Sequence, residues 1–244
     1  EFCRNNNIAV CNVQGGSAFA VAEYCIGSVI TLSRQLHLGN SALHLGEYTS
    51  IRSKMLKKKM VSLQSQNVGI VGFGSIGRET AKLFNLMGCQ ILCFDLVAPD
   101  PVEVKKVGAN ISDLPTLLSQ SDIVSLHVPL TTETEDLITK TELRLMKNNA
   151  ILVNAARGGV VNEFDLASVI ESEQIKGAVV DVYSKEPISS ENPLLNLSPI
   201  AKERVFFSPH IAGITKQSWT ELFRSSWENL SLFFDNKTPK NRQI

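Results

Sequence analysis

Residues 67–77, which read NVGIVGFGSIG, decide the fold of this chain. Their first part, 67–73, is an apolar run rich in valine and isoleucine, which is typical of a strand buried on both faces of a parallel sheet. Their second part, 72–77, has the spacing G-x-G-x-x-G and leads into a run at 76–87 with apolar residues at helical intervals. A buried strand, a glycine-rich turn and a helix, in this order, predict a turn that binds a pyrophosphate.

Each glycine of this turn has a physical reason. Gly72 permits the tight turn, Gly74 lets the backbone approach a pyrophosphate, and Gly77 lets the helix pack closely on the strand. A second apolar run, 90–94, ends at Asp95, where an acidic side chain binds the ribose 2′-hydroxyl of a dinucleotide. A carboxylate there repels a 2′-phosphate, so the motif favours NAD over NADP. The plainer alternatives are a glycine turn without a ligand and a solvated Asp95 at the end of a strand.

Short apolar runs alternate with amphipathic ones over most of the chain. We expect strands at 67–73, 90–94, 123–126, 150–154, 177–181 and 205–208, and helices at 76–87, 113–119, 139–146 and 162–172. Buried strands that alternate with helices predict an α/β protein with a doubly wound parallel sheet of the Rossmann type.

The flanks of this unit give weaker signals. We expect a lone strand at 8–13, a helix at 17–35 with the Ser17 hydroxyl as its N-cap acceptor, and an irregular connector at 38–62. The helix at 17–35 is apolar on most sides, so it is buried either in this chain or against a second one. A last helix, ending near Phe234, carries a broad apolar stripe that we expect to pack in a core. The stripe consists of Trp219, Leu222, Phe223, Trp227, Leu230 and Phe234.

The composition excludes several classes of protein. Lys and Arg number 24 and Asp and Glu also number 24, which argues against a protein that coats nucleic acid or an anionic membrane. No stretch reaches the roughly 18 apolar residues that span a bilayer, and the one basic run, 57–59, is expected to be a solvated loop. The four histidines and five cysteines lack metal-ligand spacing, so we expect no metal site. Free thiols favour a reducing, cytoplasmic setting, with import into an organelle left open.

Polar residues follow the later predicted strands. Because the carboxyl ends of parallel strands meet at one edge of a sheet, Arg157, Glu186 and His210 are expected to lie together there. Arg157 can hold a carboxylate and polarise a ketone, and His210 can supply a proton to the nascent alkoxide. Glu186 would favour the protonated imidazole. Each residue alone would be an ordinary surface or packing residue, but together they predict reduction of a carbonyl next to a carboxylate. His127 either lines the nicotinamide side or caps its strand.

Five ordered motifs resemble the D-isomer-specific 2-hydroxyacid dehydrogenases, the phosphoglycerate dehydrogenase-like family. They are VGIVGFGSIGRE (68–79), SDIVSLHVPLTTET (121–134), NAARGGVVNE (154–163), DVYSKEP (181–187) and SPHIAG (208–213), preceded by VAEY (21–24). The resemblance implies an oxidoreductase that transfers a hydride between NAD(H) and a D-2-hydroxy acid/2-oxo acid pair. It implies that Arg157, Glu186 and His210 are catalytic. The cofactor-binding residues are then expected to be Gly72, Gly74, Ser75, Ile76, Gly77, Asp95, His127, Val128, Pro129, Ala155, Asp181 and Gly213.

The resemblance also implies a domain organisation and partners. We expect an NAD-binding Rossmann domain at 15–213, with 1–14 and 214–244 as part of a flavodoxin-like substrate domain that is mostly missing at the N-terminus. In the family, the helix that corresponds to 17–35 packs in a dimer interface, so we expect a homodimer. Two alternatives to the enzyme stay open. One is an NAD(H)-binding, corepressor-like protein, and the other is a catalytically inactive, truncated member of the family.

Overall fold

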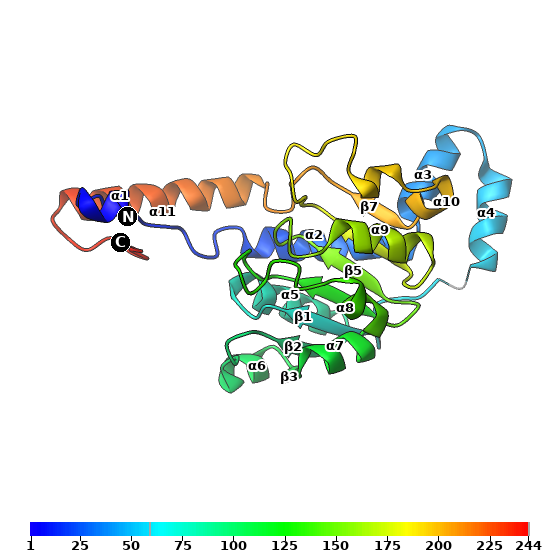
Figure 1. The fold of residues 1–244 in the computed structure, drawn as a ribbon, viewed down its shortest axis with the longest axis horizontal. Coiled ribbons are helices and arrows are strands. Elements are labelled where there is room, and N and C mark those ends of the chain that lie inside the picture. The colour runs from blue at the N-terminus through cyan, green and yellow to red at the C-terminus, as the bar shows by residue number, and fades with distance from the viewer. Residues whose placement is uncertain (59, 244) are drawn as a thin grey trace.

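A parallel sheet of seven strands forms the body of the protein (Figure 1). The computed structural model describes residues 1–58 and 60–243. Lys59, in the expected basic loop, and Ile244, at the end of the expected second-domain segment, lie outside the described residues. The strand order is β3-β2-β1-β4-β5-β6-β7. The strands are β1 (Asn67–Val71), β2 (Gln90–Phe94), β3 (Ala109–Ile111), β4 (Ile123–Leu126), β5 (Ile151–Asn154), β6 (Gly177–Val180) and β7 (Val205–Phe207).

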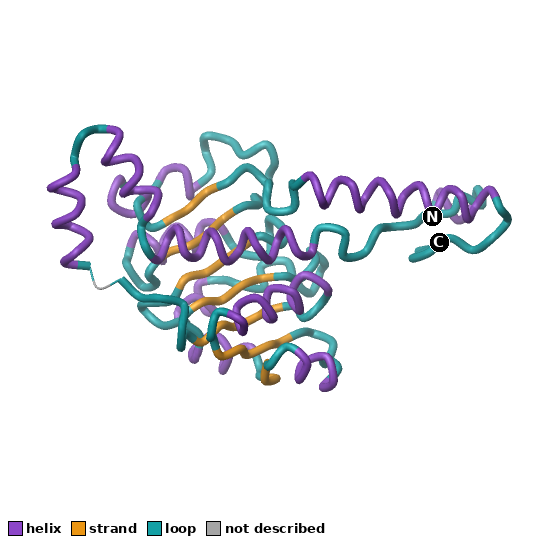
Figure 2. Tube along the Cα trace, turned by 180° about the vertical axis from the view of Figure 1, so that it is seen from behind, coloured by secondary structure: helices purple, strands orange, loops and turns teal. Residues whose placement is uncertain are grey.

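Some of the helices cover the two faces of the sheet, and others extend from it. The helices of the described chain are α1 (Phe2–Asn5), α2 (Ala18–Ser33), α3 (Leu36–His44), α4 (Tyr48–Lys57), α5 (Ser75–Leu86), α6 (Pro101–Lys106), α7 (Leu114–Gln120), α8 (Lys140–Leu145), α9 (Glu163–Glu171), the 3-10 helix η1 (Pro193–Asn196), α10 (Pro199–Lys202) and α11 (Lys216–Phe234). Figure 2 shows α2 lying across one face of the sheet. The predicted doubly wound parallel sheet is confirmed.

Each face of the sheet has its own apolar core. On one face, α2, α5 and α6 pack on the strands through residues such as Val29, Phe84 and Val104. On the other face, α7, α8 and α9 pack through residues such as Leu118 and Leu143. Every residue of β4, β5 and β6 is buried, which explains why these strands appear in the sequence as continuous apolar runs. Because α2 packs on the sheet, the helix expected at 17–35 is buried mainly in this chain. Of the two expected alternatives, burial in this chain or against a second chain, the structure shows the first.

Most predicted elements are confirmed, with small differences at their ends. The strand bounds at 90–94 and 123–126 agree fully, and the other four expected strands differ by at most two residues. Ser17 is the N-cap of α2, but its hydroxyl accepts no cap hydrogen bond, so the expected reason was wrong. The prediction missed α1, β3, α6, η1 and α10, which are short.

Two expectations about the N-terminal third are wrong. Residues 8–13 form no strand, because their only ladder contact in the described chain is an isolated bridge from Cys11 to Arg242, and a strand needs several paired residues. The expected irregular connector at 38–62 instead contains most of α3 and the whole of α4. Lys57 is the last residue of α4, so this part of the basic run is helical rather than a loop. Leucine, methionine, lysine and arginine in this segment favour a helix.

The apolar stripe of α11 is not in a core, which overturns another expectation. Trp219 is 49% exposed and Trp227 is 67% exposed, and Phe223 and Phe234 are exposed as well. In Figures 1 and 2, α11 extends away from the sheet, and the N-terminal segment runs beside it. The helix itself is long and amphipathic as expected, but the described residues provide little for its stripe to pack against. None of the helices described is long and apolar enough to cross a membrane.

Candidate active site

The strand register gathers the predicted site residues in a row. Val71 of β1 is paired with Phe94 of β2 and with Leu126 of β4, so the residues that follow these strands are neighbours. The same register continues from Leu126 through Asn154 and Val180 to the end of β7. The residues just beyond this line are Gly72, Asp95, His127, Ala155, Asp181 and Ser208. The order of the strands reverses between β1 and β4, because β2 and β3 lie on one side of β1 and β4 to β7 lie on the other. Ligands bind at such a point in open α/β sheets.

The glycine turn after β1 has the shape of an anion cradle. Gly72 has a φ of +94°, and a Cβ atom there would lie 2.6 Å from the carbonyl carbon of His127. A Cβ atom on Gly77 would lie 2.0 Å from the Gly72 oxygen, so α5 could not pack this closely on β1 with any larger residue. A Cβ atom on Gly74 would meet nothing within 4 Å, so the turn faces open space there.

The first turn of α5 leaves backbone donors for a ligand. Gly74 is the N-cap of α5, no side chain caps this end, and Ser75 and Ile76 begin the helix. The N–H groups of a first turn have no intrahelical acceptor and, with the helix dipole, attract an anion. The open space at Gly74 and these donors fit a pyrophosphate.

Asp95 connects the end of β2 to this turn. Its Oδ2 accepts a hydrogen bond from the Phe73 backbone N–H at 2.6 Å. The carboxylate is only partly buried, so it borders the place where the ribose of a dinucleotide would follow its pyrophosphate. The turn and Asp95 together therefore fit the adenosine half of a dinucleotide.

The residues after β4, β5 and β7 form the next part of the edge. The His127 imidazole contacts the Ser125 hydroxyl through Nε2 at 2.9 Å, and burial lowers the pKa of His127 to about 3, so the ring is neutral. Val128 and Ala155 are buried, Pro129 is exposed, and Gly213 lies against Ser17 at the start of α2. The His127 ring thus bonds back onto its own strand, which agrees with the strand-capping alternative.

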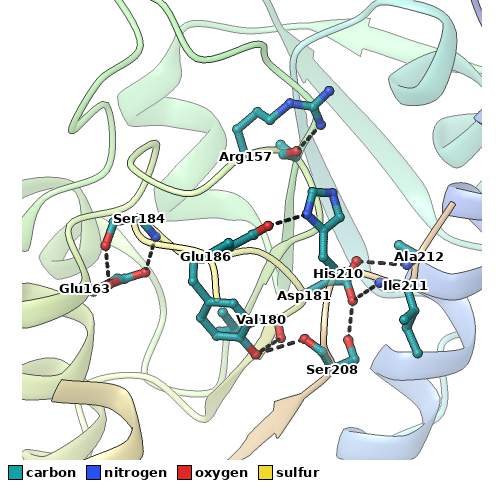
Figure 3. A network of polar contacts seen from close by, with 12 residues as sticks. Arg157, Glu163, Val180, Asp181, Ser184, Glu186, Ser208, His210, Ile211 and Ala212 are labelled. Carbon is teal, nitrogen blue, oxygen red and sulfur yellow. Dashed lines mark hydrogen bonds and ion pairs between the residues drawn. The ribbon is translucent and has the colours of Figure 1, made fainter. Parts of the chain in front are cut away.

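Asp181 holds the turn that carries His210. Its Oδ1 accepts hydrogen bonds from the Ser208 hydroxyl and from the Ile211 N–H, and its Oδ2 accepts one from the Ala212 N–H at 2.8 Å (Figure 3). The Asp181 carbonyl oxygen accepts the His210 N–H at 2.8 Å. Because Asp181 is fully buried and both carboxylate oxygens have donors within the chain, its observed contacts are structural ones.

His210 and Glu186 form a hydrogen-bonded pair at this edge. The His210 Nδ1 lies 2.7 Å from the Glu186 Oε2, and the Tyr183 N–H donates to the Glu186 Oε1 at 3.0 Å. Desolvation raises the pKa of Glu186, but the hydrogen bonds from His210 and Tyr183 and the charge of Arg157 outweigh it and hold the pKa below its ordinary value. The pair therefore contains a carboxylate that stays ionised in contact with one ring nitrogen of the imidazole.

Arg157 lies on the same side of the edge as this pair. It follows β5, its Nη1 donates to the Ala156 oxygen at 2.6 Å, and the Asn154 side chain donates to its carbonyl oxygen at 3.2 Å. In Figure 3 the guanidinium group lies above the His210 ring, on the side away from Asp181. The structure thus brings together the three polar residues that the sequence predicted for this edge. Their chemistry is that of a cation, a proton donor and a carboxylate that supports the donor.

Sequence reasoning missed the residues that hold this group in place. The Tyr183 hydroxyl donates a hydrogen bond to the Ser208 carbonyl oxygen at 2.9 Å. The Ser208 hydroxyl contacts the Tyr24 hydroxyl, which lies on α2. Glu163 accepts hydrogen bonds from Ser184 in the loop of Glu186. Both Ser208 and Glu163 stand at an end of one of the five motifs, which was the only signal available. Among the described residues, no group of three or more His, Cys, Asp or Glu side chains could hold a metal ion.

Comparisons with known proteins agree with this geometry. Residues 26–212 match the family described as D-isomer specific 2-hydroxyacid dehydrogenase, NAD binding domain. The D-3-phosphoglycerate dehydrogenase of Archaeoglobus fulgidus is 34% identical over 212 residues, which are 86% of this chain and 38% of that protein. The (S)-sulfolactate dehydrogenase of Chromohalobacter salexigens is 34% identical over 218 residues, 89% of this chain and 67% of that protein.

A solved structure extends the likeness to three dimensions. The D-lactate dehydrogenase of Lactobacillus jensenii, crystallised with NAD+, is 26% identical and has a TM-score of 0.83 over 99% of this chain and 73% of its own. This chain spans 38% and 67% of the lengths of the two relatives named above, so it matches part of each of them. The chain belongs to the D-isomer specific 2-hydroxyacid dehydrogenase family, and its parallel sheet with the surrounding helices is the NAD-binding domain of that family.

Proposed function

We propose that this protein is an NAD-dependent oxidoreductase that interconverts a D-2-hydroxy acid and the corresponding 2-oxo acid. The observation that carries the proposal is the 2.7 Å contact between His210 Nδ1 and Glu186 Oε2, at the edge of the sheet that also holds Arg157 and the glycine turn. The relatives named above are dehydrogenases, and their names support the class of reaction.

The glycine turn and its neighbours are the proposed cofactor site. The backbone N–H groups of Ser75 and Ile76 would hold the pyrophosphate, and Asp95 would accept a hydrogen bond from the adenosine ribose. When bound, the nicotinamide supplies or accepts the hydride. Val128 and Ala155 follow the neighbouring strands β4 and β5, and Gly213 lies beyond β7, so these residues would border the rest of the cofactor.

The chain's own residues account for substrate binding and proton transfer. Arg157 would bind the substrate carboxylate through its planar guanidinium group and polarise the adjacent carbonyl. His210 would donate the proton from Nε2 to the carbonyl oxygen during reduction, because its Nδ1 is engaged by Glu186. Glu186 stays ionised and thereby stabilises the imidazolium before transfer. In the opposite direction the neutral imidazole accepts the hydroxyl proton.

A His210→Ala variant tests this function. Loss of the proton donor is expected to lower turnover about 100-fold or more, while the affinity for NADH stays nearly unchanged, because His210 is remote from the glycine turn. NADH binding is measured by fluorescence titration and turnover by a screen of 2-oxo acids. The screen uses this chain and a form extended at the N-terminus to the length of its relatives. Equal turnover in the variant and the parent would refute the assignment, and NADH binding without turnover in both forms would favour a binding protein or an inactive member.

We also propose the domain organisation expected from the sequence, with 15–213 as the cofactor domain and 1–14 with 214–244 as part of a second domain. Support comes from the contact between these two terminal segments. Gln243 donates to the Val10 oxygen at 2.8 Å, and a cavity of about 600 Å³ with mostly apolar side chains lies between the N-terminal segment and α11. The two segments therefore pack on each other, away from the sheet (Figure 1).

A homodimer is the proposed assembly, and the cytoplasm the proposed location. The outer surface of α2 carries an exposed Phe19, and the α3–α4 hairpin carries exposed leucines, which include Leu43 and Leu45. Exposed apolar side chains on neighbouring elements are typical of an interface. The five free cysteines suit a reducing compartment.

A further inference from the structure

Glu163, the first residue of α9, has three hydrogen-bond donors on its carboxylate. Its Oε1 accepts the Ser184 N–H at 2.8 Å. Its Oε2 accepts the Ser184 hydroxyl at 2.7 Å and the Asn192 side-chain amide at 2.7 Å. Figure 3 shows the carboxylate facing Ser184, which lies on the loop between β6 and η1. A side chain of α9 therefore ties down both ends of loop 184–192.

The three donors require a group that only accepts. The Asn192 Oδ1 accepts the Leu194 N–H at 3.0 Å and so caps η1, which fixes the amide nitrogen toward Glu163. The Ser184 N–H is a backbone donor and cannot reverse its role. A carboxylate meets all three donors, whereas a glutamine of the same size would present its own N–H groups to one of them.

The loop that Glu163 holds also carries Glu186. The Tyr183 N–H, next to Ser184, donates to one oxygen of Glu186, and the other oxygen contacts His210. The same part of the loop lies directly against the segment of Arg157, because a Cβ atom on Gly158 would lie 1.8 Å from the Tyr183 oxygen. A shift of Tyr183 and Ser184 would therefore move Glu186 relative to His210.

We propose that Glu163 is a positioning residue that fixes loop 184–192 on α9 and so keeps Glu186 in contact with His210. The chemical meaning of this contact rests on the function proposed above, but the contact itself can be measured without substrate or cofactor. Asp165 provides a matched control: it is also in the first turn of α9, and its Oδ2 accepts the Lys140 N–H at 2.9 Å instead of a donor from the loop.

The test is an NMR measurement, at one fixed pH, of the ring resonances of His210 in the whole chain. The chain has four histidines, so the loss of one set of resonances in His210→Gln identifies the signal. In Glu163→Gln both His210 and Glu186 remain, so a change in the ring ¹⁵N and ¹H chemical shifts reports a change in the contact between Nδ1 and Glu186.

We expect the ring signals of His210 to move in Glu163→Gln, and to move further in the same direction in Glu186→Gln, because the first change disturbs the Nδ1 contact and the second removes its carboxylate. Asp165→Asn should leave the ring signals unchanged. Ser184→Ala, which removes one donor and keeps the backbone one, should move the signals by less than Glu163→Gln does.

Two results would overturn the inference. If Glu186→Gln moves the ring signals but Glu163→Gln and Ser184→Ala do not, Glu163 has no positioning role, although the His210–Glu186 pair stands. If Glu186→Gln itself leaves the ring signals unchanged, the pair is absent in solution and the proposed function loses its main support too. Amide spectra of each variant show whether it is folded, and Ser184→Ala serves as the test if Glu163→Gln is not.

Discussion

The imidazole of His127 is next to the glycine turn, yet its surroundings differ from those of His210. Its Nε2 contacts the Ser125 hydroxyl, and its Nδ1 is buried without a hydrogen-bond partner among the residues described. Burial without an acidic neighbour lowers the pKa of His127 to about 3, so the ring is uncharged wherever the protein is folded near neutral pH. A neutral ring can border a cofactor site without adding charge to it.

This burial predicts a pH dependence of stability. The pKa of His127 is about 3 in the folded state and about 6.5 in the unfolded state, so between these values only the unfolded state binds the proton. The free energy of unfolding should therefore fall as the pH decreases from about 6.5, by up to about 1.4 kcal/mol per pH unit from this group. His127→Gln should flatten this part of the curve, as measured by urea unfolding at a series of pH values. The variant differs from the parent only at residue 127, so a difference in slope between the two curves reports His127. Parallel curves for parent and variant would contradict the prediction.

Residue types and their order predicted which side chains meet at the edge of the sheet, but not how they are held. Arg157, Glu186 and His210 each follow a buried strand, and parallel strands align their ends whatever the loops do. The support given by Asp181 and Glu163 depends on hydrogen bonds across loops, and no periodicity of the sequence encodes such contacts. Asp181 was expected at the cofactor, and the structure adds that its carboxylate holds the turn of His210.

At the scale of elements, length and burial decided what could be predicted. The strands β2 and β4 and the helix α5 lie in continuous or periodic apolar runs, so their bounds follow closely from the sequence. The strand β3 has three residues and pairs only with β2 at an edge of the sheet, so it leaves too short a pattern to detect. The hairpin of α3 and α4 projects from the body and buries few of its side chains, so the core-facing pattern that marks the other helices is missing from its sequence.

The exposed side of α2 leads to a prediction about assembly. Phe19 is 58% exposed on this helix, whose other side packs on the sheet. If this surface forms the proposed homodimer, Phe19→Glu places a charge in an apolar interface and should weaken dimerisation at least about tenfold. Sedimentation equilibrium measures the effect. Leu86→Glu, at an exposed leucine that ends α5, is the control and should leave the dimer intact; a parent chain that is monomeric at high concentration would refute the proposed dimer.

At the scale of the whole molecule, the chain has two parts with different packing. The sheet and its helices enclose two apolar cores, whereas α11 and the N-terminal segment contact each other and leave the stripe of α11 exposed. The sequence pattern indicated an amphipathic helix in α11, but the pattern cannot tell which partner covers its apolar side. The expectation of a core was wrong for this reason.

The two tryptophans make this difference measurable, because Trp219 and Trp227 are both on α11 and the chain has no others. In this chain we expect the emission of solvent-exposed indoles and strong quenching by acrylamide, since the side chains are half or more exposed. If the stripe belongs to a second domain, the N-terminally extended form should shift the emission to shorter wavelength and protect it from acrylamide, because burial removes water from the indole. A similar shift that depends on protein concentration would indicate self-association through α11 instead. Unchanged emission in the extended form would contradict the proposed domain organisation, even if the cofactor domain binds NADH.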